Sequence, residues 1–222
     1  TQFRENAMSV ELHGYQHSVY SWIARLALRE KGVEHTWTEV NPFAENVPDS
    51  YLAMHPFKRV PTLVHGDIVV FETNAITRYV DEAFSGAPLQ RTSPTERAIC
   101  NQIISIVDSY VYWPLVRQVF GHGVFRPRLG RPSDRGEVER GMDAAPKVLG
   151  SLEKLASRSR FVCGDEVSLA DIHLGPMIGY FALFPEGKSL LDRYERLGTW
   201  WSAMSTRLSV QATMPLLPGP ET

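Results

Sequence analysis

The stretch from residue 55 to residue 79, HPFKRVPTLVHGDIVVFETNAITRY, constrains the fold of this chain more than any other segment. It begins with a turn, because neither Pro56 nor Pro61 can donate a backbone hydrogen bond. Two short apolar runs follow, at 62–65 and 68–71, and the Gly-Asp pair between them predicts a β-hairpin. The rest of the stretch has helical spacing. The segment therefore predicts a turn, two antiparallel strands and a helix, in that order.

The predicted helix starts beside the predicted turn. Glu72 begins the helical pattern, and Thr73 is placed to act as its N-cap. The hairpin brings both residues close to an extended backbone at Val60. Backbone groups at Val60 can pair with a peptide, helix N–H groups can hold a carboxylate, and Glu72 can bind an amine. This arrangement predicts a binding site for a small zwitterionic peptide.

These residues resemble the glutathione-binding half of the glutathione S-transferases, whose motif is Val-Pro before a strand and Glu/Gln-Ser-x-Ala-Ile after it. Here the motif reads Val60-Pro61 and ETNAI from Glu72 onward, with Thr73 in place of the usual Ser. The resemblance implies a cis bond before Pro61 and glutathione as co-substrate, with no metal. It places the glutathione contacts at Arg59, Val60, Pro61, Glu72 and Thr73; the Arg59 guanidinium can pair with a carboxylate. The alternative is a generic αβ unit with a prolyl turn.

The first third of the chain has the element order of a thioredoxin-like domain. Residues 9–13 alternate as a strand, 19–31 place their apolar side chains on one helical face, and 33–40 form a second strand. A short irregular helix is expected at 48–54, before the hairpin. The resulting order, βαβ followed by ββα, predicts a thioredoxin-like glutathione-binding domain over residues 8–84.

Ser18 lies between the first strand and the first helix, where the helix dipole favours negative charge. The segment beginning there, SVYSWIARLAL, resembles the serine-type glutathione transferases of the phi, zeta and theta-like bacterial forms. In those proteins the matching serine donates a hydrogen bond to the glutathione sulfur. A hydrogen bond to a charged acceptor contributes about 1.5–3 kcal/mol, which lowers a thiol pKa by roughly one to two units. The resemblance therefore implies Ser18 as the catalytic residue.

Other assignments stay open in this loop. Ser18 can simply cap its helix, which serines do without any catalysis. Tyr15 is the main rival as the thiol-activating group, because other classes of the family use a tyrosine near this loop. Tyr20 and Ser21 are further competitors. The loop contains no cysteine, which disfavours the disulfide-reducing, cysteine-type branch.

Residues around the turn are weaker candidates. Lys58 is expected to be solvated, and His55 is expected to be a packing or turn residue. Asn46 and Val47 stand where relatives of the phi type carry basic residues. The glycine-carboxylate end of glutathione is therefore left without a predicted partner there.

Composition bounds the remaining possibilities. The 222 residues are 43% apolar and 22% charged, as in ordinary globular proteins, and suffice for one large or two small domains. A net charge of -2 gives no reason to expect nucleic-acid or membrane binding. Two cysteines, Cys100 and Cys163, argue against a disulfide framework and favour a reducing compartment. Without a membrane-spanning apolar run, or an apolar signal core in residues 1–6, we expect a cytoplasmic protein.

The rest of the chain is predicted to be helical. Turn-forming residues at 85–93 indicate a linker, and residues 94–215 form the predicted all-helical C-terminal domain. One long helix is expected at 95–120, with a kink at Pro114, and another at 133–156.

Two shorter segments of this domain carry specific expectations. Residues 121–132 are rich in Gly, Pro and Arg, which is more typical of a mobile, solvated loop than of an anion site formed by the arginines. The Ser-x-x-Asp pattern from Ser168 to Asp171 predicts a capping box. It resembles the buried capping box of the family, so its expected role is in folding.

A pocket between the two domains is expected to hold the second substrate. The side chains expected to line it are Tyr15, Tyr110, Trp113 and Arg117, with Val116 and Phe120 beside them. The same stripe of residues is equally expected of an ordinary helix core. An aromatic lining favours bulky hydrophobic electrophiles.

Together these features predict a glutathione S-transferase fold, with an α/β thioredoxin-like N-terminal domain and an all-α C-terminal domain. The expected reaction joins the glutathione thiolate to a hydrophobic electrophile, in detoxification, and the resemblance implies a homodimer. One alternative is a glutathione-dependent isomerase of the maleylacetoacetate-isomerase kind, prompted by Ser18-x-x-Ser21-Trp22. Another is a non-catalytic glutathione-binding carrier or scaffold, suggested by Thr73 and by the absence of a basic residue at 46–47.

Overall fold

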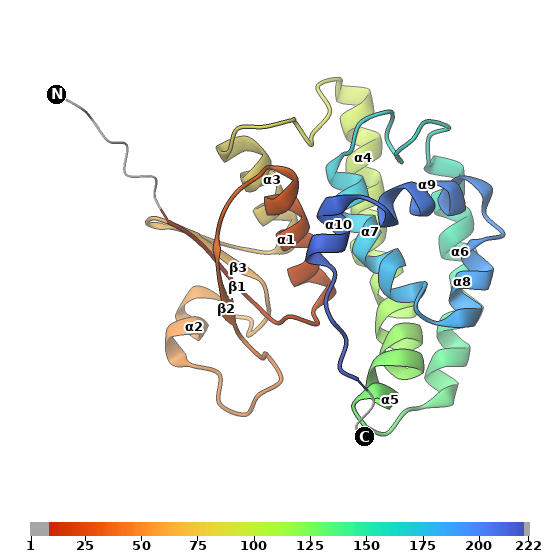
Figure 1. Cartoon of the computed structure of the whole chain (residues 1–222), viewed down its shortest axis with the longest axis horizontal. Coiled ribbons are helices and arrows are strands. Elements are labelled where there is room, and N and C mark those ends of the chain that lie inside the picture. Colours follow the sequence, from red (N-terminus) through yellow and green to blue (C-terminus); the bar gives the residue numbers. More distant parts are fainter. Residues whose placement is uncertain (1–8, 220–222) are drawn as a thin grey trace. The chain divides into compact units, whose positions relative to one another are not determined.

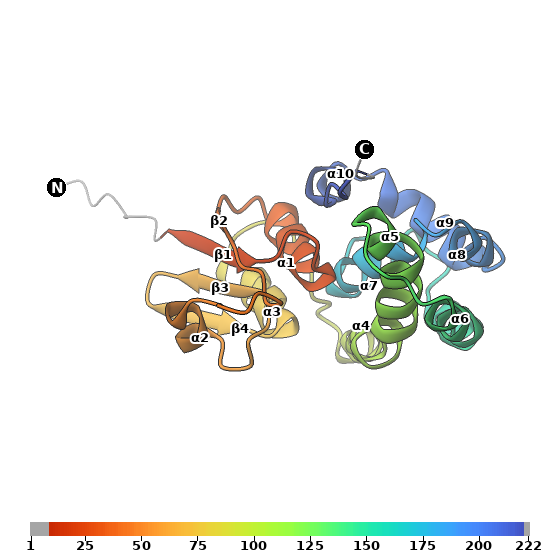
Figure 2. The same cartoon turned by 90° about the horizontal axis from the view of Figure 1, so that it is seen from below.

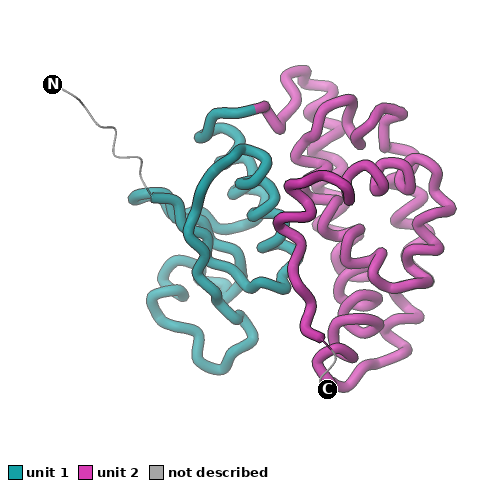
Figure 3. The backbone as a smooth tube through the Cα atoms, viewed as in Figure 1, with its two compact units in different colours: residues 1–86 teal, residues 87–222 magenta. Residues whose placement is uncertain are grey.

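The computed structural model describes residues 9–219 and divides into two compact units, residues 1–86 and 87–222 (Figure 3). The expectation about an apolar signal core concerns residues 1–6, which lie outside the described residues. Each unit has its own set of buried apolar side chains.

The first unit is built on a four-stranded mixed sheet with the strand order β2-β1-β3-β4 (Figure 2). The strands are β1 (Val10–Gly14), β2 (Thr36–Glu39), β3 (Thr62–His65) and β4 (Ile68–Phe71). β1 runs parallel to β2, and the other two pairings are antiparallel. The predicted hairpin therefore forms at the predicted residues.

The second strand is shorter than the predicted 33–40, because the end of the preceding helix uses the residues before it. Gly32 takes the left-handed conformation, with φ of 67°. The N–H of Val33 then bonds to the carbonyl of Leu28 at 2.9 Å, which satisfies the helix end. The strand consequently begins only at Thr36.

Helices cover both faces of this sheet (Figures 1 and 2). α1 (Val19–Glu30) and α3 (Thr73–Ala83) lie on one face, and the short α2 (Asp49–Met54) lies on the other. The core between the sheet and the helix pair contains fully buried apolar side chains, among them Leu12, Trp22, Leu63 and Ile76. A buried ion pair, Lys31 Nζ to Asp81 Oδ1 at 3.1 Å, links the end of α1 to α3. This is the predicted thioredoxin-like arrangement.

The start of α3 differs from the prediction by one residue. Glu72 is the N-cap and Thr73 is the first helical residue, so the expectation that Thr73 caps the helix is wrong. Glu72 has φ of 68° and ψ of 117°, outside the helical region, and the helix can begin only after it.

The second unit is entirely helical within the described residues. Its elements are α4 (Pro94–Ile106), η1 (Val107–Phe125), α5 (Arg126–Arg128), α6 (Arg135–Leu155), α7 (Leu169–Phe181), α8 (Pro185–Leu191), α9 (Glu195–Ser205) and α10 (Leu208–Thr213). α7 is buried along its whole length, and it packs against α4, η1 and α9 (Figure 1). It forms the centre of this unit.

The helix that starts with α4 extends further than predicted. It continues without a break through η1, a stretch of π-helix that contains Pro114, and on into α5. At its end the N–H of Arg126 bonds to the carbonyl of Gly121, five residues back. The predicted loop at 121–132 is therefore wrong for its first eight residues, 121–128, which are helical.

The capping box at the start of α7 forms as predicted. Asp171 Oδ2 accepts hydrogen bonds from the Ser168 N–H at 2.8 Å and from its hydroxyl at 2.6 Å. Asp171 Oδ1 accepts from the Val162 N–H at 2.9 Å and from Trp200 Nε1 at 2.8 Å. Burial raises the pKa of Asp171, while these hydrogen bonds oppose that shift. One buried carboxyl thus joins α7, α9 and the loop before α7.

Candidate functional site

The strand register of the first unit brings three loops together at one end of the strands. His13, near the end of β1, is opposite Thr62 at the start of β3. Thr62 is in turn opposite Phe71, the last residue of β4. The loop after β1, the turn before β3 and the start of α3 therefore meet at this end of the sheet. They carry Ser18, the Val60-Pro61 pair and Glu72 respectively.

Ser18 is the N-cap of α1. Its backbone is extended, with φ of -73° and ψ of 127°, and its Oγ accepts the N–H of Ser21 at 3.3 Å. Its own N–H bonds to the Tyr15 carbonyl at 2.9 Å, which fixes the loop. A serine hydroxyl that accepts through one lone pair still has its O–H to donate. Capping and donation to a ligand are therefore compatible roles for this partly exposed side chain.

The competing residues of this loop have structural contacts. Ser21 is fully buried, and its Oγ accepts the Tyr15 N–H at 3.2 Å. The ring of Tyr15 makes edge-on contacts with His17, at a centroid distance of 5.4 Å, and with Phe43, at 6.1 Å. Ser21 is thus part of the loop's internal bonding. Tyr15 is partly exposed and is still a rival to Ser18.

The turn before β3 contains a cis peptide bond between Val60 and Pro61. Buried Tyr51 supports this turn, since its hydroxyl donates to the Arg59 carbonyl at 2.6 Å and lies 3.1 Å from Thr62 Oγ1. The Arg59 side chain is exposed. In the described part of the chain the Val60 backbone has no hydrogen-bond partner. Its N–H and C=O are therefore available to an extended peptide ligand.

Glu72 holds an unusual backbone conformation for a residue with a side chain. A φ of 68° in a non-glycine residue is sterically disfavoured, and such residues cluster at ligand sites. Its side chain is exposed, while Thr73 beside it is 7% exposed. The first N–H groups of an α-helix have no intrahelical partner, so the start of α3 can receive a carboxylate.

Two further residues of the turn act within the protein. Lys58 was expected to be solvated; its side chain is exposed, but Nζ donates to the Ala44 carbonyl at 3.0 Å. His55 is 2% exposed and packs against Phe71 at a centroid distance of 4.7 Å. Its Nδ1 has no hydrogen-bond partner among residues 9–219. Burial lowers the pKa of His55, which outweighs the opposite effect of Glu72.

The residues assigned to the second-substrate pocket fall into two groups. Tyr110, at 65% exposed, Trp113, at 59%, and Arg117 lie on the exposed side of η1. Val116 and Phe120 are buried in the core of the helical unit, where Phe120 stacks on Tyr180 at 4.0 Å. The expectation that these two line the pocket is therefore not supported by their burial.

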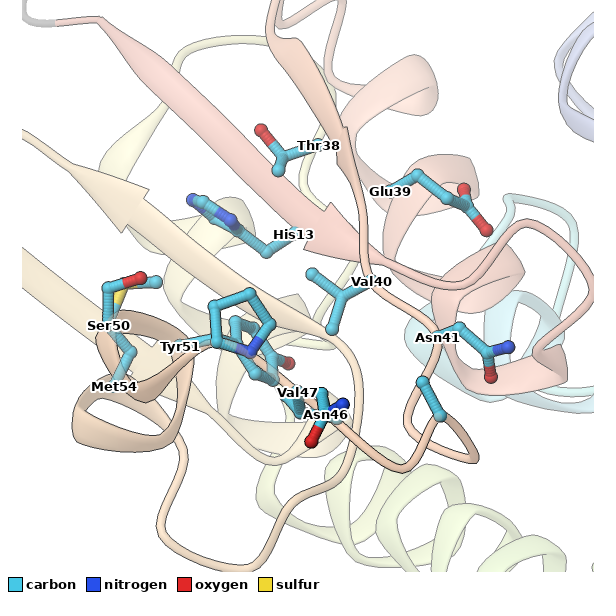
Figure 4. Close-up of a pocket in the computed structure, with 12 residues that line it drawn as sticks. His13, Thr38, Glu39, Val40, Asn41, Asn46, Val47, Ser50, Tyr51 and Met54 are labelled. Carbon is cyan, nitrogen blue, oxygen red and sulfur yellow. The ribbon is translucent and has the colours of Figure 1, made fainter.

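A hollow of about 220 Å³ lies between the sheet and the α2 segment of the first unit (Figure 4). His13, Thr38 and Val40 line it from the strand side, and Asn46 and Tyr51 line it from the other. None of the predicted site residues lines it. Val47, from the position expected to be basic in phi-type relatives, packs with Val40 and Tyr51 in a small apolar cluster. Sequence reasoning missed Tyr51, whose support of the turn depends on the folding of α2.

The described residues lack two features that would point to other kinds of function. Within residues 9–219 there is no group of three or more His, Cys, Asp or Glu side chains arranged to hold a metal ion. Over the same range, no helix is both long and apolar enough to cross a membrane.

A thioredoxin-like unit with a cis-proline before β3, followed by an all-helical unit, defines the glutathione transferase class of fold. The sequence model of the glutathione S-transferase N-terminal domain matches residues 12–88, and that of the C-terminal domain matches residues 135–200. Glutathione S-transferase F10 of Arabidopsis thaliana is 32% identical over 188 residues, which covers 83% of this chain and 86% of that protein. The chain belongs to the glutathione S-transferase family.

Other relatives extend over nearly the whole chain. Glutathione S-transferase 1 of Zea mays is 29% identical over 205 residues, covering 90% of this chain and 94% of that protein. The structure of glutathione S-transferase III in apo form superimposes with a TM-score of 0.81 at 29% identity, covering 96% of this chain and 99% of that one. Glutathione S-transferase-I bound with lactoylglutathione gives a TM-score of 0.78 at 26% identity, with coverages of 93% and 98%.

Proposed function

We propose that this glutathione transferase uses Ser18 to stabilise the glutathione thiolate for attack on a hydrophobic electrophile. The observation that carries the proposal is the position of Ser18 at the N-terminus of α1, with its O–H still able to donate. A free thiol with a pKa of about 8.5 is only about 3% ionised at pH 7. One hydroxyl donor and one helix N-terminus suffice to make the thiolate a major species. The rest of the acceleration comes from holding both reactants together.

The three loops at this end of the sheet each bind a different part of glutathione. The Val60 backbone pairs with the peptide groups of glutathione, while the start of α3 at Thr73 receives a carboxylate. The exposed Glu72 carboxylate binds the amine. The exposed Arg59 guanidinium pairs with a carboxylate. Pro61 fixes the direction of the turn. Glutathione is thus the co-substrate, and the proposed chemistry needs no metal ion.

Substituting Ser18 tests this mechanism. Ser18→Ala removes the hydroxyl and also the cap, which by itself costs about 0.5–2 kcal/mol of stability. Ser18→Gly removes the hydroxyl but costs only a few tenths of a kcal/mol as a cap. We expect both variants to lose about 10–100-fold in kcat/KM with glutathione and a chlorinated aromatic electrophile below pH 7, because the thiol pKa rises by one to two units.

The readout that separates the roles is the pH profile of the reaction. In both variants the apparent thiol pKa is expected to shift upward, so the rate deficit shrinks in alkaline buffer. A Ser18→Gly variant with the wild-type profile would show that Ser18 only caps its helix. A Tyr15→Phe variant with the upward shift would transfer the role to Tyr15. Failure of the protein to bind glutathione in calorimetry would leave only a carrier or scaffold role.

The isomerase alternative is prompted by Ser21 and Trp22 following Ser18. Ser21 is fully buried and accepts the Tyr15 N–H, and Trp22 is fully buried in the core of the first unit. Packing therefore accounts for both residues, and turnover of a maleyl-type substrate without glutathione consumption tests the isomerase alternative.

The second substrate is proposed to be a bulky hydrophobic electrophile bound by Tyr15, Tyr110, Trp113 and Arg117. The support is chemical: exposed aromatic rings offer large contact areas at low entropic cost, and the guanidinium can hold an acidic substituent. Trp113→Ala is expected to raise KM for the electrophile and leave KM for glutathione unchanged. An equal effect on both values would place Trp113 elsewhere.

The proposal extends to assembly and location. We propose a homodimer in the cytoplasm, acting in detoxification. The family resemblance and the low cysteine content support this. Light scattering at micromolar concentration tests the assembly, and a monomer mass would contradict it.

A further inference from the structure

Tyr51 of α2 makes two hydrogen bonds to the chain around the Val60-Pro61 pair. It is 3% exposed, and its hydroxyl donates to the Arg59 carbonyl at 2.6 Å. The same oxygen lies 3.1 Å from Thr62 Oγ1. A phenol has one proton and a carbonyl can only accept, so that proton lies in the bond to Arg59. The Thr62 hydroxyl therefore donates to Tyr51, and the phenol oxygen bridges the residues on either side of the Val60-Pro61 pair.

The sheet fixes one end of this bridge. Thr62 is fully buried, and in the sheet it lies opposite His13 of β1 and Phe71 of β4. The ring of Tyr51 is also enclosed, since the His13 ring lies at a centroid distance of 6.1 Å and the His55 ring at 6.3 Å. Tyr51 and His13 both line the hollow drawn in Figure 4. The phenol hydroxyl is therefore held at one place relative to the strands.

The peptide group between Arg59 and Val60 links the bridge to the exposed backbone of the turn. Among residues 9–219 only the Val60-Pro61 bond is cis, so the Arg59–Val60 peptide group is trans. In a trans peptide group the C=O and the N–H share one plane and point in opposite directions. Because Tyr51 holds the Arg59 C=O, the Val60 N–H points away from the Tyr51 hydroxyl. The hydroxyl therefore sets the direction of a donor that has no partner in the described part of the chain.

Two further observations support a fixed geometry at this turn. The Val60 side chain packs against the apolar cluster of Val40, Val47 and Tyr51, so the residue is held on its side-chain side as well. Burial raises the pKa of Tyr51, while its hydrogen bond with Thr62 acts in the opposite direction. The phenol therefore keeps its proton, and goes on donating it, at neutral and mildly alkaline pH.

We propose that Tyr51 is a positioning residue of the glutathione site, which directs the Val60 N–H toward the ligand through the Arg59 carbonyl. This inference rests on the proposed function, in which the Val60 backbone pairs with the peptide groups of glutathione. Tyr51 itself is buried and acts from inside the protein. Its hydroxyl therefore controls how tightly glutathione binds, and the stabilisation of the thiolate is left to Ser18.

The experiment compares Tyr51→Phe, which removes only the bridging hydroxyl, with Tyr79→Phe in the full chain. Tyr79 is the matched control, because its hydroxyl lies 2.9 Å from Nδ1 of His65, at the other end of β3. We expect Tyr51→Phe to raise Kd for glutathione in calorimetry, and KM with it, by about three- to tenfold, the net effect of one hydrogen bond. In Tyr79→Phe the urea midpoint should fall as it does in Tyr51→Phe, but Kd should not change. Both variants should keep the wild-type kcat and the wild-type pH profile.

Two results would overturn the positioning role of Tyr51. One is an equal Kd for Tyr51→Phe and Tyr79→Phe, whether both values rise or neither does. The other is an altered thiol pKa in the pH profile of Tyr51→Phe, which would place the hydroxyl at the sulfur.

A second pair of variants tests the bridge even if Tyr51→Phe does not fold. Thr62→Val removes the hydroxyl that donates to Tyr51, and Thr62→Ser keeps it. Thr62→Val should bind glutathione more weakly than Thr62→Ser, and equal Kd values would contradict the bridge. A wild-type protein that does not bind glutathione at all would instead contradict the proposed function itself.

Discussion

Glu72 combines an exposed carboxylate with a backbone conformation that costs free energy. A non-glycine residue held at positive φ stores about 1–3 kcal/mol, which the surrounding structure must offset. The residue also immediately precedes the first turn of α3, whose N–H groups lie at the same end of the sheet. Backbone strain and the proposed ligand contact therefore occur at the same residue, and substitutions that change only one of them can separate their effects.

We predict that Glu72→Gly raises the free energy of unfolding by about 1 kcal/mol while weakening glutathione binding. Glycine adopts positive φ without steric cost, so the strain is released. The carboxylate that binds the amine is lost, so Kd for glutathione should rise at least tenfold. Urea denaturation and calorimetry measure the two effects. Glu72→Gln is the matched control, expected to lose affinity without gaining stability; equal affinity for all three proteins would exclude an amine contact.

At the residue scale, the motif at 60–76 was sufficient to predict the turn and the hairpin, because short-range spacing sets both. The glutathione contacts assigned to it stay predictions. The positive φ of Glu72 could not be read from the sequence. It arises because the chain must turn out of β4 and into α3 within one residue. The support of the turn by Tyr51 was missed for a similar reason, since it depends on where α2 packs.

At the element scale, His55 begins the turn before β3 and is buried between α2 and the hairpin, although most of the turn is exposed. His55 contacts Tyr51 of α2 at a centroid distance of 6.3 Å and Phe71 of β4 at 4.7 Å. Burial lowers the pKa of His55 and so disfavours its protonated form in the fold. Protonation would place a charge among these aromatic rings.

We predict that this turn makes the protein sensitive to acid. A histidine whose folded pKa is below its unfolded value of about 6.5 contributes stability that is complete above that pH. The contribution is lost as the pH falls from about 6.5 toward the folded pKa. The free energy of unfolding should therefore drop more between pH 7.5 and 5.5 in wild type than in His55→Phe. Denaturation curves at both pH values measure this, with His35→Phe, outside the turn, as control; parallel losses in all three would remove His55 as the cause.

Prediction at this scale succeeded where capping and turn chemistry are local, and it failed where packing decides. The capping box at Ser168 and the hairpin at 62–71 follow from residue types at fixed spacing. The helical stretch at 121–128 contains Gly, Pro and Arg, which favour a loop by propensity. Its extension is stabilised instead by buried apolar contacts, such as Val124, and the ring of Phe125 stacks on Phe120. Tertiary contacts of this kind outweigh intrinsic helix preference.

At the scale of the whole molecule, each unit has its own core. A substitution that disrupts one core should therefore destabilise the unit that contains it. Asp171 makes all its hydrogen bonds inside the helical unit. The buried ion pair of Lys31 and Asp81 lies inside the first unit. The chain therefore offers a perturbation specific to each unit.

We predict that Asp171→Asn destabilises the helical unit by about 2–4 kcal/mol. Its amide nitrogen cannot accept the bonds from the Ser168 N–H and hydroxyl, so buried donors lose their acceptor. Hydrogen exchange should speed up in α7 and α9, while Kd for glutathione at low temperature stays unchanged. Asp165→Asn, at an exposed position six residues earlier, is the control. A weaker affinity in folded Asp171→Asn would show that the units are energetically coupled.

The complete burial of α7 also bears on how this chain is made. A helix without a polar face has no stable position in water until neighbours surround it, and its neighbours come from both sides of it in the sequence. On the ribosome, α4 and η1 emerge before α7, but α9 emerges after it. A nascent chain that ends at residue 181 therefore exposes the apolar side of α7 that α9 covers in the complete fold. Truncation between α7 and α9 should consequently yield aggregates, and synthesis in the cell should depend on chaperones for that interval.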